Sequence, residues 1–186
     1  MKQPIAAFTV IPLLLVCSLA FAQREETLDS RVQAFLDSNA RQWRDMNVPM
    51  TDGRILYNII VENGYTQAYE IGTSTGHSTI WIAWALAKTG GRLTTVEIDE
   101  RRYELARRNV AEAGLSDYVE FTLGNAHTLV PEAQGPYDFV FSDADKDWYI
   151  NYFDAMYPKL TDDACFVAHN VEESTFRFLG GWEAEY

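Results

Sequence analysis

Hydrophobic and polar positions along the chain follow two different periods. Over residues 25–44, apolar side chains recur at helical spacing among polar ones, which predicts an amphipathic helix. A second helix is predicted to begin at Thr51-Asp52 and to end at Gly64, because glycine readily adopts the left-handed conformation that terminates helices. These two helices precede a long region with a different pattern.

From residue 68 onward, short apolar runs alternate with helical patterns. Strands are predicted at residues 68–72, 93–98, 119–124, 138–143 and 164–169, and helices at 77–88, 100–113, around 127–132 and at 148–160. The helix from Ser78 is apolar on almost every side, as expected for a helix buried against a sheet. Strands that alternate with helices predict an α/β, doubly wound, mostly parallel sheet covered by helices on both faces.

Composition limits the size and the partners of this fold. The 186 residues, 47% of them hydrophobic, suffice for one domain with a substantial core. The 27 acidic and 15 basic side chains give a net charge of −12. This charge opposes binding to a phosphate backbone, so no nucleic-acid partner is expected. Two cysteines, Cys17 and Cys165, cannot build a disulfide framework.

The N-terminus has the pattern of a secretory leader. Lys2 precedes an uncharged apolar stretch that ends in Ala20-Phe21-Ala22, with small residues where a signal peptidase cuts. Residues 1–22 are therefore predicted to be a signal peptide and residues 23–186 one domain, exported to the periplasm or the extracellular space. The alternative is a retained membrane anchor, because residues 5–22 just reach the length that spans a bilayer.

The first strand of the alternating region ends in a glycine-containing turn. Its sequence, Glu70-Ile-Gly-Thr-Ser-Thr-Gly-His-Ser78, contains two glycines that allow backbone amides to approach a ligand. The turn lacks the first G-x-G of the dinucleotide fingerprint, which argues against a nicotinamide dehydrogenase. At the end of the next strand, Glu97 has a position from which a carboxylate can accept both hydroxyls of a ribose, so a nucleoside ligand is predicted.

Four segments in this order resemble a known family. They read EIGTSTGHS, TVEID, FSDADKDWY and VAHN, and the resemblance runs from about residue 44 to 171. It is to the class I S-adenosylmethionine-dependent O-methyltransferases of the catechol and caffeoyl-CoA type. The resemblance implies a Rossmann-like fold with the strand order 3-2-1-4-5 and N-terminal helices, and S-adenosylmethionine as the cofactor.

The same resemblance assigns cofactor-binding residues. The turn after the first strand would line the methionine end, Glu70 would support that turn, Glu97 would hold the ribose, and Ile98 would flank the adenine. Asn125-Ala126-His127 would border the purine, although His127 fits a surface helix position equally well, and Met46-Asn47-Val48 would cover the cofactor. The assigned cofactor residues are Glu70, Gly72, Thr73, Ser74, Gly76, Ser78, Glu97, Ile98, Asn125, Ala126 and Asp143.

Catalytic and metal-binding residues are implied at the ends of the fourth and fifth strands. The family holds a divalent metal there that lowers the pKa of a bound hydroxyl, and Asp143, His169 and Asn170 occupy the ligand positions. Lys146 matches the general base, and Asp143 with Lys146 forms the expected catalytic pair. The alternatives are that Asp143 and Asp145 cap a helix, that Lys146 is a solvated charge, and that a second carboxylate such as Asp145 reaches the ion.

Two features depart from the family. His169 stands where metal-dependent members carry Asp, and imidazole favours Mn, Fe or Zn over Mg, unless His169 only packs at the strand end and no metal binds. Only 16 residues follow Asn170, whereas the family fold continues with a helix and two strands. We therefore expect a C-terminally short domain in which the fifth strand is an exposed edge, which is an association liability. The alternatives are a fragment, a partner in a swapped homodimer and an inactive descendant.

Two functions from different classes follow. The first is O-methylation of a hydroxyl on a small phenolic or catechol-like acceptor. The second is an inactive module that binds S-adenosylmethionine without turnover.

Overall fold

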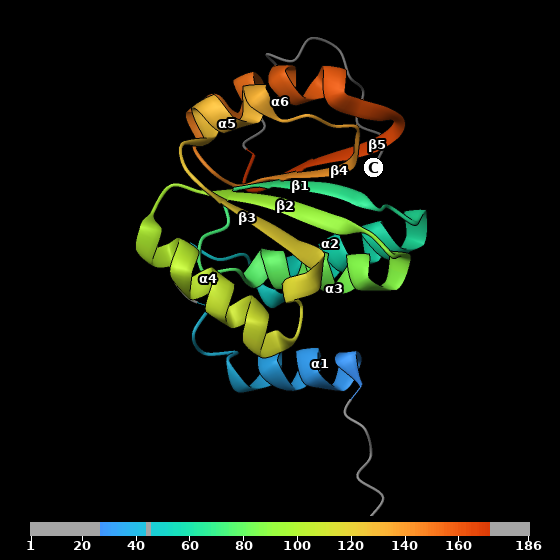
Figure 1. Cartoon of the computed structure of the whole chain (residues 1–186), viewed down its shortest axis with the longest axis vertical. Helices are drawn as coiled ribbons and strands as arrows, with labels where there is room; N and C mark the ends of the chain where they lie inside the picture. Colours follow the sequence, from blue (N-terminus) through green and yellow to red (C-terminus); the bar gives the residue numbers. More distant parts are fainter. Residues whose placement is uncertain (1–26, 44–45, 172–186) are drawn as a thin grey trace, which may run out of the picture.

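The computed structural model describes residues 27–43 and 46–171 (Figure 1). The helices are α1 (Leu28–Ser38), α2 (Met50–Asn63), α3 (His77–Thr89), α4 (Glu100–Ala113), α5 (Ala126–Glu132) and α6 (Tyr149–Met156). The strands are β1 (Gln67–Ile71), β2 (Arg92–Glu97), β3 (Val119–Leu123), β4 (Tyr137–Ser142) and β5 (Leu160–Ala168). Short 3₁₀ turns, η1 (Ser116–Tyr118), η2 (Lys146–Trp148) and η3 (Tyr157–Lys159), complete the described chain.

The five strands form one parallel sheet in the order β3-β2-β1-β4-β5. In this register Tyr69 of the central strand lies opposite Thr94 of β2 and Val140 of β4. Helices α2, α3 and α4 cover one face and α5 and α6 the other, while α1 lies outside α3 and α4 (Figure 1). The expected Rossmann-like, doubly wound architecture and its strand order are confirmed.

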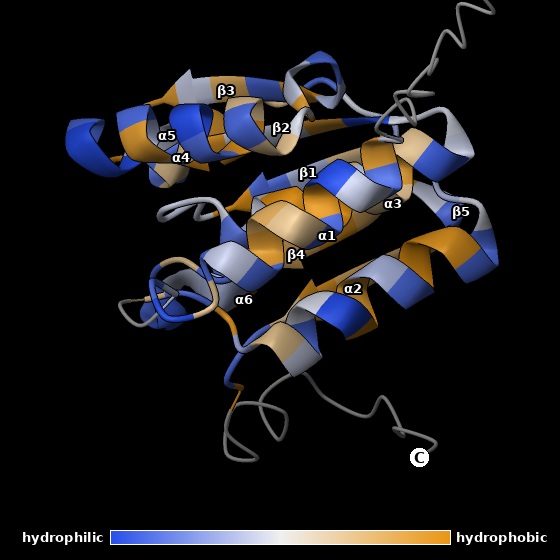
Figure 2. Ribbon diagram, turned by 90° about the horizontal axis from the view of Figure 1, so that it is seen from below, coloured by the Kyte–Doolittle hydropathy of each residue, from blue (hydrophilic) through white to orange (hydrophobic). Residues whose placement is uncertain are grey.

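Alternating side chains of the strands supply both halves of the core. Ala68 and Phe139 pack with α2 and α3 on one face, whereas Tyr69 and Val140 pack with α5 and α6 on the other. Strands buried on both faces require the continuous apolar runs seen in the sequence. Figure 2 shows the same division, with α3 largely hydrophobic and the outer helix α4 mostly hydrophilic.

Local sequence signals set several helix ends. Asp99 caps α4 by accepting a hydrogen bond from the Arg102 N–H at 2.9 Å. Gly64 ends α2 in the left-handed conformation, with φ of 69°, as the sequence predicts.

Other predicted boundaries were wrong. The helix expected over residues 25–44 ends at Ser38, and the one expected over 148–160 ends at Met156. The fifth strand begins earlier than predicted, at Leu160, and is an edge of the described sheet. The predicted leader, residues 1–22, lies outside the described residues. Within the part of the chain that the structure describes, no helix has the length and apolar character needed to cross a membrane.

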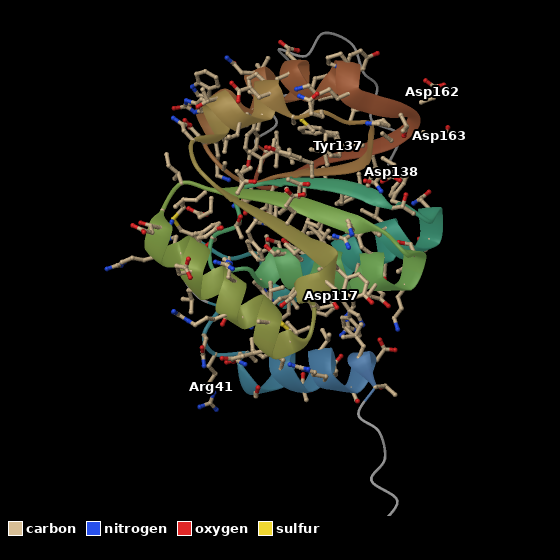
Figure 3. All side chains as sticks on the ribbon, viewed as in Figure 1. Arg41, Asp117, Tyr137, Asp138, Asp162 and Asp163 are labelled. Atoms are coloured by element: carbon tan, nitrogen blue, oxygen red, sulfur yellow. The ribbon has the colours of Figure 1, made fainter. Side chains whose placement is uncertain are left out.

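Asp138 joins the amino ends of β1 and β4, at the end of the sheet away from the carboxyl ends of the strands. Its carboxylate accepts hydrogen bonds from the N–H and the hydroxyl of Thr66, at 2.7 and 3.1 Å, and from the Gln67 N–H at 2.8 Å. Figure 3 places it near Asp162 and Asp163, which lie in the exposed part of β5.

Replacing Asp138 by Ala is expected to destabilise the fold. The change removes three hydrogen bonds to a half-buried carboxylate, which should lower the free energy of unfolding by about 2 kcal/mol. Urea denaturation measures this difference. Asp162→Ala, at an exposed position of the same end, is the matched control and should change stability by less than about 0.5 kcal/mol. Equal effects of the two variants would contradict the assignment.

Candidate active site

A tight turn after β1 brings the ends of β1 and β4 into backbone contact. Gly72 has φ of +99°, and a Cβ at this position would lie 2.9 Å from the carbonyl oxygen of Asp143. Gly76 begins α3 with φ of +93°, where a Cβ would lie 3.2 Å from Ala106. Both positions therefore require glycine, for its conformational freedom and for its lack of a side chain.

Glu97 holds this turn from the end of β2. One carboxylate oxygen, Oε2, accepts a hydrogen bond from the Ser74 N–H at 2.7 Å, and the other, Oε1, accepts from the N–H groups of Ile98 and Asp99 at 3.1 and 2.9 Å. The Glu97 residue is only 7% exposed. These bonds fix Ser74 in a left-handed conformation, with φ of 50°, and leave Oε2 able to accept a further donor.

Glu70 lies beneath the turn and is fully buried. Its Oε2 accepts hydrogen bonds from the hydroxyls of Thr79 and Thr95, each at 2.6 Å. Because the Thr95 hydroxyl donates to Glu70, it accepts from the Thr73 hydroxyl, also at 2.6 Å. Burial raises the pKa of the Glu70 carboxyl to about 7, although hydrogen bonds from Ser78 and the two threonines oppose that shift.

The turn, the ends of β2 and β4 and the start of α5 enclose a cavity of about 400 Å³. Seven of the predicted cofactor residues line it: Gly72, Ser74, Glu97, Ile98, Asn125, Ala126 and Asp143. The other four predicted residues do not line the cavity. Glu70 and Thr73 take part in hydrogen bonds beneath the turn, whereas Gly76 and Ser78 lie at the start of α3. Two large apolar side chains, Met46 and Ile98, line the cavity and are each 66% exposed. The cavity thus combines a fixed carboxylate with uncovered apolar surface.

Several residues line the cavity although the sequence analysis did not assign them to a site. They are Val96, Arg102, Gly124, Ala144, Asp145 and Tyr152. Arg102 lies in the first turn of α4. Because Asp99 marks the start of that helix, the sequence could have indicated that Arg102 lies close to the end of β2. Tyr152 reaches the cavity from α6, and no sequence pattern indicates this. His127 also lines the cavity; its ring stacks on Trp148 at 3.6 Å between ring centroids, and its Nε2 lies 3.3 Å from Asp145 Oδ2.

The segment before α2 is held against the glycine turn. The Thr75 hydroxyl donates to Asn47 Oδ1 at 3.0 Å. His77 Nε2 accepts from the Trp81 indole N–H at 3.2 Å, so His77 Nδ1 carries the hydrogen that it donates to the Val48 carbonyl at 2.8 Å. Burial lowers the pKa of His77, which favours this neutral form. These contacts place Met46 beside the cavity, consistent with the covering role expected for residues 46–48.

The predicted catalytic residues meet where β4 and β5 end. Lys146 Nζ lies 3.5 Å from Asp143 Oδ1, 3.5 Å from the Tyr149 hydroxyl and 3.3 Å from the His169 carbonyl oxygen. The Tyr149 hydroxyl donates to that same carbonyl at 2.8 Å, and burial raises the pKa of Tyr149. Lys146 is therefore placed at the Asp143 end of the cavity, with its side chain half exposed.

Asp145, named above as a possible second carboxylate at the ion, lies beyond the end of β4. β4 ends at Ser142, and Asp145 instead caps the 3₁₀ turn η2 by accepting a hydrogen bond from the Asp147 N–H at 3.2 Å. Its carboxylate also approaches His127 and not His169. The capping alternative is the correct one for Asp145.

The expected metal ligands are partly assembled. His169 Nδ1 lies 3.3 Å from Asp143 Oδ2, is buried and has no hydrogen-bond partner, so an acceptor atom is available beside a carboxylate. Asn170 follows with φ of 54°. Within residues 27–43 and 46–171 no group of three or more His, Cys, Asp or Glu side chains is arranged to hold a metal ion, and the expected set contains only two such residues and an amide. Asp143 and His169 fit a metal as neighbouring donors, while the remaining positions would need other oxygen ligands.

The strand order and the turn define the class of protein. A parallel sheet whose strand order reverses between β1 and β4, with a glycine turn and a carboxylate at the carboxyl ends of β1 and β2, is a Rossmann-like nucleotide-binding fold. The O-methyltransferase family model matches residues 22–171, and the chain belongs to this family.

Relatives and solved structures agree with this assignment. The chain is 41% identical over 106 residues to a catechol O-methyltransferase of Niastella koreensis, covering 55% of this chain and 48% of that protein. It is 34% identical over 139 residues to a catechol O-methyltransferase of Mycobacterium tuberculosis, covering 74% and 63%. An O-methyltransferase from Bacillus cereus, solved in complex with SAH, shares 32% identity with a TM-score of 0.66, covering 75% of this chain and 66% of that one. The chain thus spans about half to two thirds of the length of these curated relatives.

The buried carboxyl of Glu70 predicts a pH-dependent stability. Its pKa of about 7 in the folded protein lies above the ordinary value of 4.5, so its contribution is complete below pH 4.5 and is lost as the pH rises through 7. Urea denaturation between pH 5 and pH 8 should show wild type losing about 2.5 kcal/mol relative to Glu70→Gln, which cannot ionise. A constant difference between the two proteins over this range would show that Glu70 ionises normally.

Proposed function

We propose that the chain is an S-adenosylmethionine-dependent O-methyltransferase that methylates a hydroxyl of a small phenolic or catechol-like acceptor. The observation that carries this proposal is the position of Glu97, a buried carboxylate whose Oε2 can still accept a donor inside the cavity. A ribose hydroxyl is such a donor. The solved structures of two similar proteins support the choice of cofactor: the Bacillus cereus protein was solved with SAH, and an O-methyltransferase of Streptomyces achromogenes, 29% identical with a TM-score of 0.65 over 80% of this chain and 68% of that one, was solved with SAM.

The cavity lining fits the parts of this cofactor. Ile98 and Met46 offer apolar surface for a flat base, next to Glu97 for the ribose. The glycine turn and the buried Ser74 hydroxyl, which has no hydrogen-bond partner, face the remaining end. At that end the cavity reaches Asp143, where the reacting methyl group would meet the acceptor.

The residues at the end of β4 supply the acid-base chemistry. In methyl transfer the bond from sulfur to the methyl carbon breaks as the acceptor oxygen forms its bond to that carbon, and the hydroxyl proton passes to a base. Lys146 is the base that takes that proton, because its Nζ lies 3.5 Å from Oδ1 of Asp143, which lines the cavity. The protein otherwise acts mainly by orienting the two reactants.

Asp143, His169 and Asn170 are the residues that would hold a divalent metal. Such an ion would supply a positive charge that lowers the pKa of the acceptor hydroxyl.

Catechol is the acceptor class named for the two curated relatives described above, and it is proposed for this chain on that basis. Export through residues 1–22, membrane anchoring by the same segment, and a homodimer remain predictions from the sequence.

Glu97 is expected to determine cofactor affinity. Glu97→Ala removes a charged acceptor inside the cavity, and loss of one such bond, about 1.5–3 kcal/mol, should weaken S-adenosylmethionine binding by about ten- to a hundredfold. Isothermal titration calorimetry measures the dissociation constant. Glu104→Ala, on the exposed side of α4, is the control and should bind as wild type does. Unchanged affinity in Glu97→Ala would refute the proposed ribose contact.

Lys146 is expected to determine turnover and not cofactor binding. Lys146→Ala should lower kcat for a catechol panel by about 10²- to 10⁴-fold, the usual contribution of a general base, with little change in the dissociation constant for S-adenosylmethionine. Lys88→Ala, at an ion pair on the far side of the sheet from α6, is the control. Tight cofactor binding without turnover of any acceptor, with Mg²⁺, Mn²⁺ or Zn²⁺ present, would support the inactive binding module instead.

A further inference from the structure

His169 contacts carboxylates on both sides of its ring. Nε2 lies 3.0 Å from Asp52 Oδ2, in the first turn of α2, and Nδ1 lies 3.3 Å from Asp143 Oδ2, just after β4. The His169 side chain is only 17% exposed. The sequence indicated Asp52 only as the start of a helix and not as a site residue. It precedes the glycine turn and belongs to α2, which lies on one face of the sheet.

Asp52 determines which nitrogen of His169 carries hydrogen. An ionised carboxylate can only accept, so the 3.0 Å contact requires the hydrogen to be on Nε2. In the neutral ring Nδ1 then has a lone pair, and this atom is buried without a hydrogen-bond partner. The lone pair faces Asp143 Oδ2, so two acceptor atoms lie 3.3 Å apart. Such a pair is unfavourable unless a positive species lies between them.

Lys146 does not fill this position. Its Nζ approaches the other carboxylate oxygen, Asp143 Oδ1, at 3.5 Å, and its side chain is half exposed. A proton between Nδ1 and Oδ2 would form a hydrogen bond, but the contact lacks the alignment of one, since Nδ1 has no hydrogen-bond partner. A cation held by both atoms would satisfy the two acceptors.

We propose that Asp52 is a positioning residue: it fixes the tautomer of His169 so that Nδ1, together with Asp143 Oδ2, anchors a divalent cation of the type that prefers imidazole, Zn²⁺ before Mg²⁺. Metal-ligating histidines usually donate their other N–H to a carboxylate, which orients the ring and raises the basicity of the ligating nitrogen. Asp52 provides that carboxylate from α2. The inference deepens the proposed function, since the cation would lie at the acceptor end of the same cavity.

Metal binding to the full chain tests this proposal without measuring turnover. Titration with Co²⁺, followed by its visible absorption, and displacement by Zn²⁺ should reveal one site in wild type, and a large excess of Mg²⁺ should not displace the Co²⁺. His169→Ala should abolish the site. Asp52→Ala should weaken Co²⁺ binding by about 10- to 100-fold, the usual cost of losing such an outer carboxylate, and Asp52→Glu should recover part of the affinity.

The controls separate this role from a structural one. Asp37→Asn, which changes an exposed carboxylate on α1, should bind Co²⁺ as wild type does. His169→Asp should reverse the preference, binding Mg²⁺ or Mn²⁺ more tightly relative to Zn²⁺, because a carboxylate replaces the imidazole. Far-ultraviolet circular dichroism checks that each variant is folded.

Two results would overturn the proposal. Either wild type binds no Co²⁺ or Zn²⁺, or Asp52→Ala binds the metal as tightly as wild type. Calorimetric titration with S-adenosylmethionine in the presence of a chelator distinguishes these failures from a failure of the proposed function. Cofactor binding without metal binding would refute only the cation site, and metal binding without cofactor binding would refute only the methyltransferase.

Discussion

The close approach of Gly72 to Asp143 is the constraint on which the candidate site depends. A Cβ on Gly72 would lie 2.9 Å from the Asp143 carbonyl oxygen, so the turn after β1 and the end of β4 can meet only where a side chain is missing. This contact occurs between the two strands where the winding of the sheet reverses. It places the turn that would receive a cofactor directly beside the residues that would perform the chemistry.

Two glutamates stabilise this turn with different hydrogen-bond donors. Glu97, at the end of β2, receives three backbone N–H groups, which stabilise a carboxylate that borders the cavity. Glu70, beneath the turn, receives only hydroxyl donors and is fully buried, so its pKa rises to about 7. The buried carboxyl of Glu70 can therefore be neutral near physiological pH.

The opposite end of the cavity is assembled from segments that are distant in the chain. Asp143 follows β4, Lys146 belongs to η2, His169 follows β5 and Asp52 begins α2. Their side chains approach one another because the carboxyl ends of parallel strands meet at one edge of the sheet and α2 packs across that region. Membership in the O-methyltransferase family agrees with this arrangement, while the histidine between two carboxylates is a feature of this chain's own residues.

The sequence by itself determined the alternation of strands and helices, the glycine turn and Glu97, because local periodicity and strand-end positions carry that information. It did not determine where helices near residues 38 and 156 end, since tertiary packing decides such boundaries. It left two roles open for Asp145, a cap and a second ligand, because the end of β4 at Ser142 depends on pairing with β1 and β5. Only the tertiary structure decided that Asp52 contacts His169 and that Tyr152 reaches the cavity, because contacts between distant segments arise from packing and leave no local pattern in the chain.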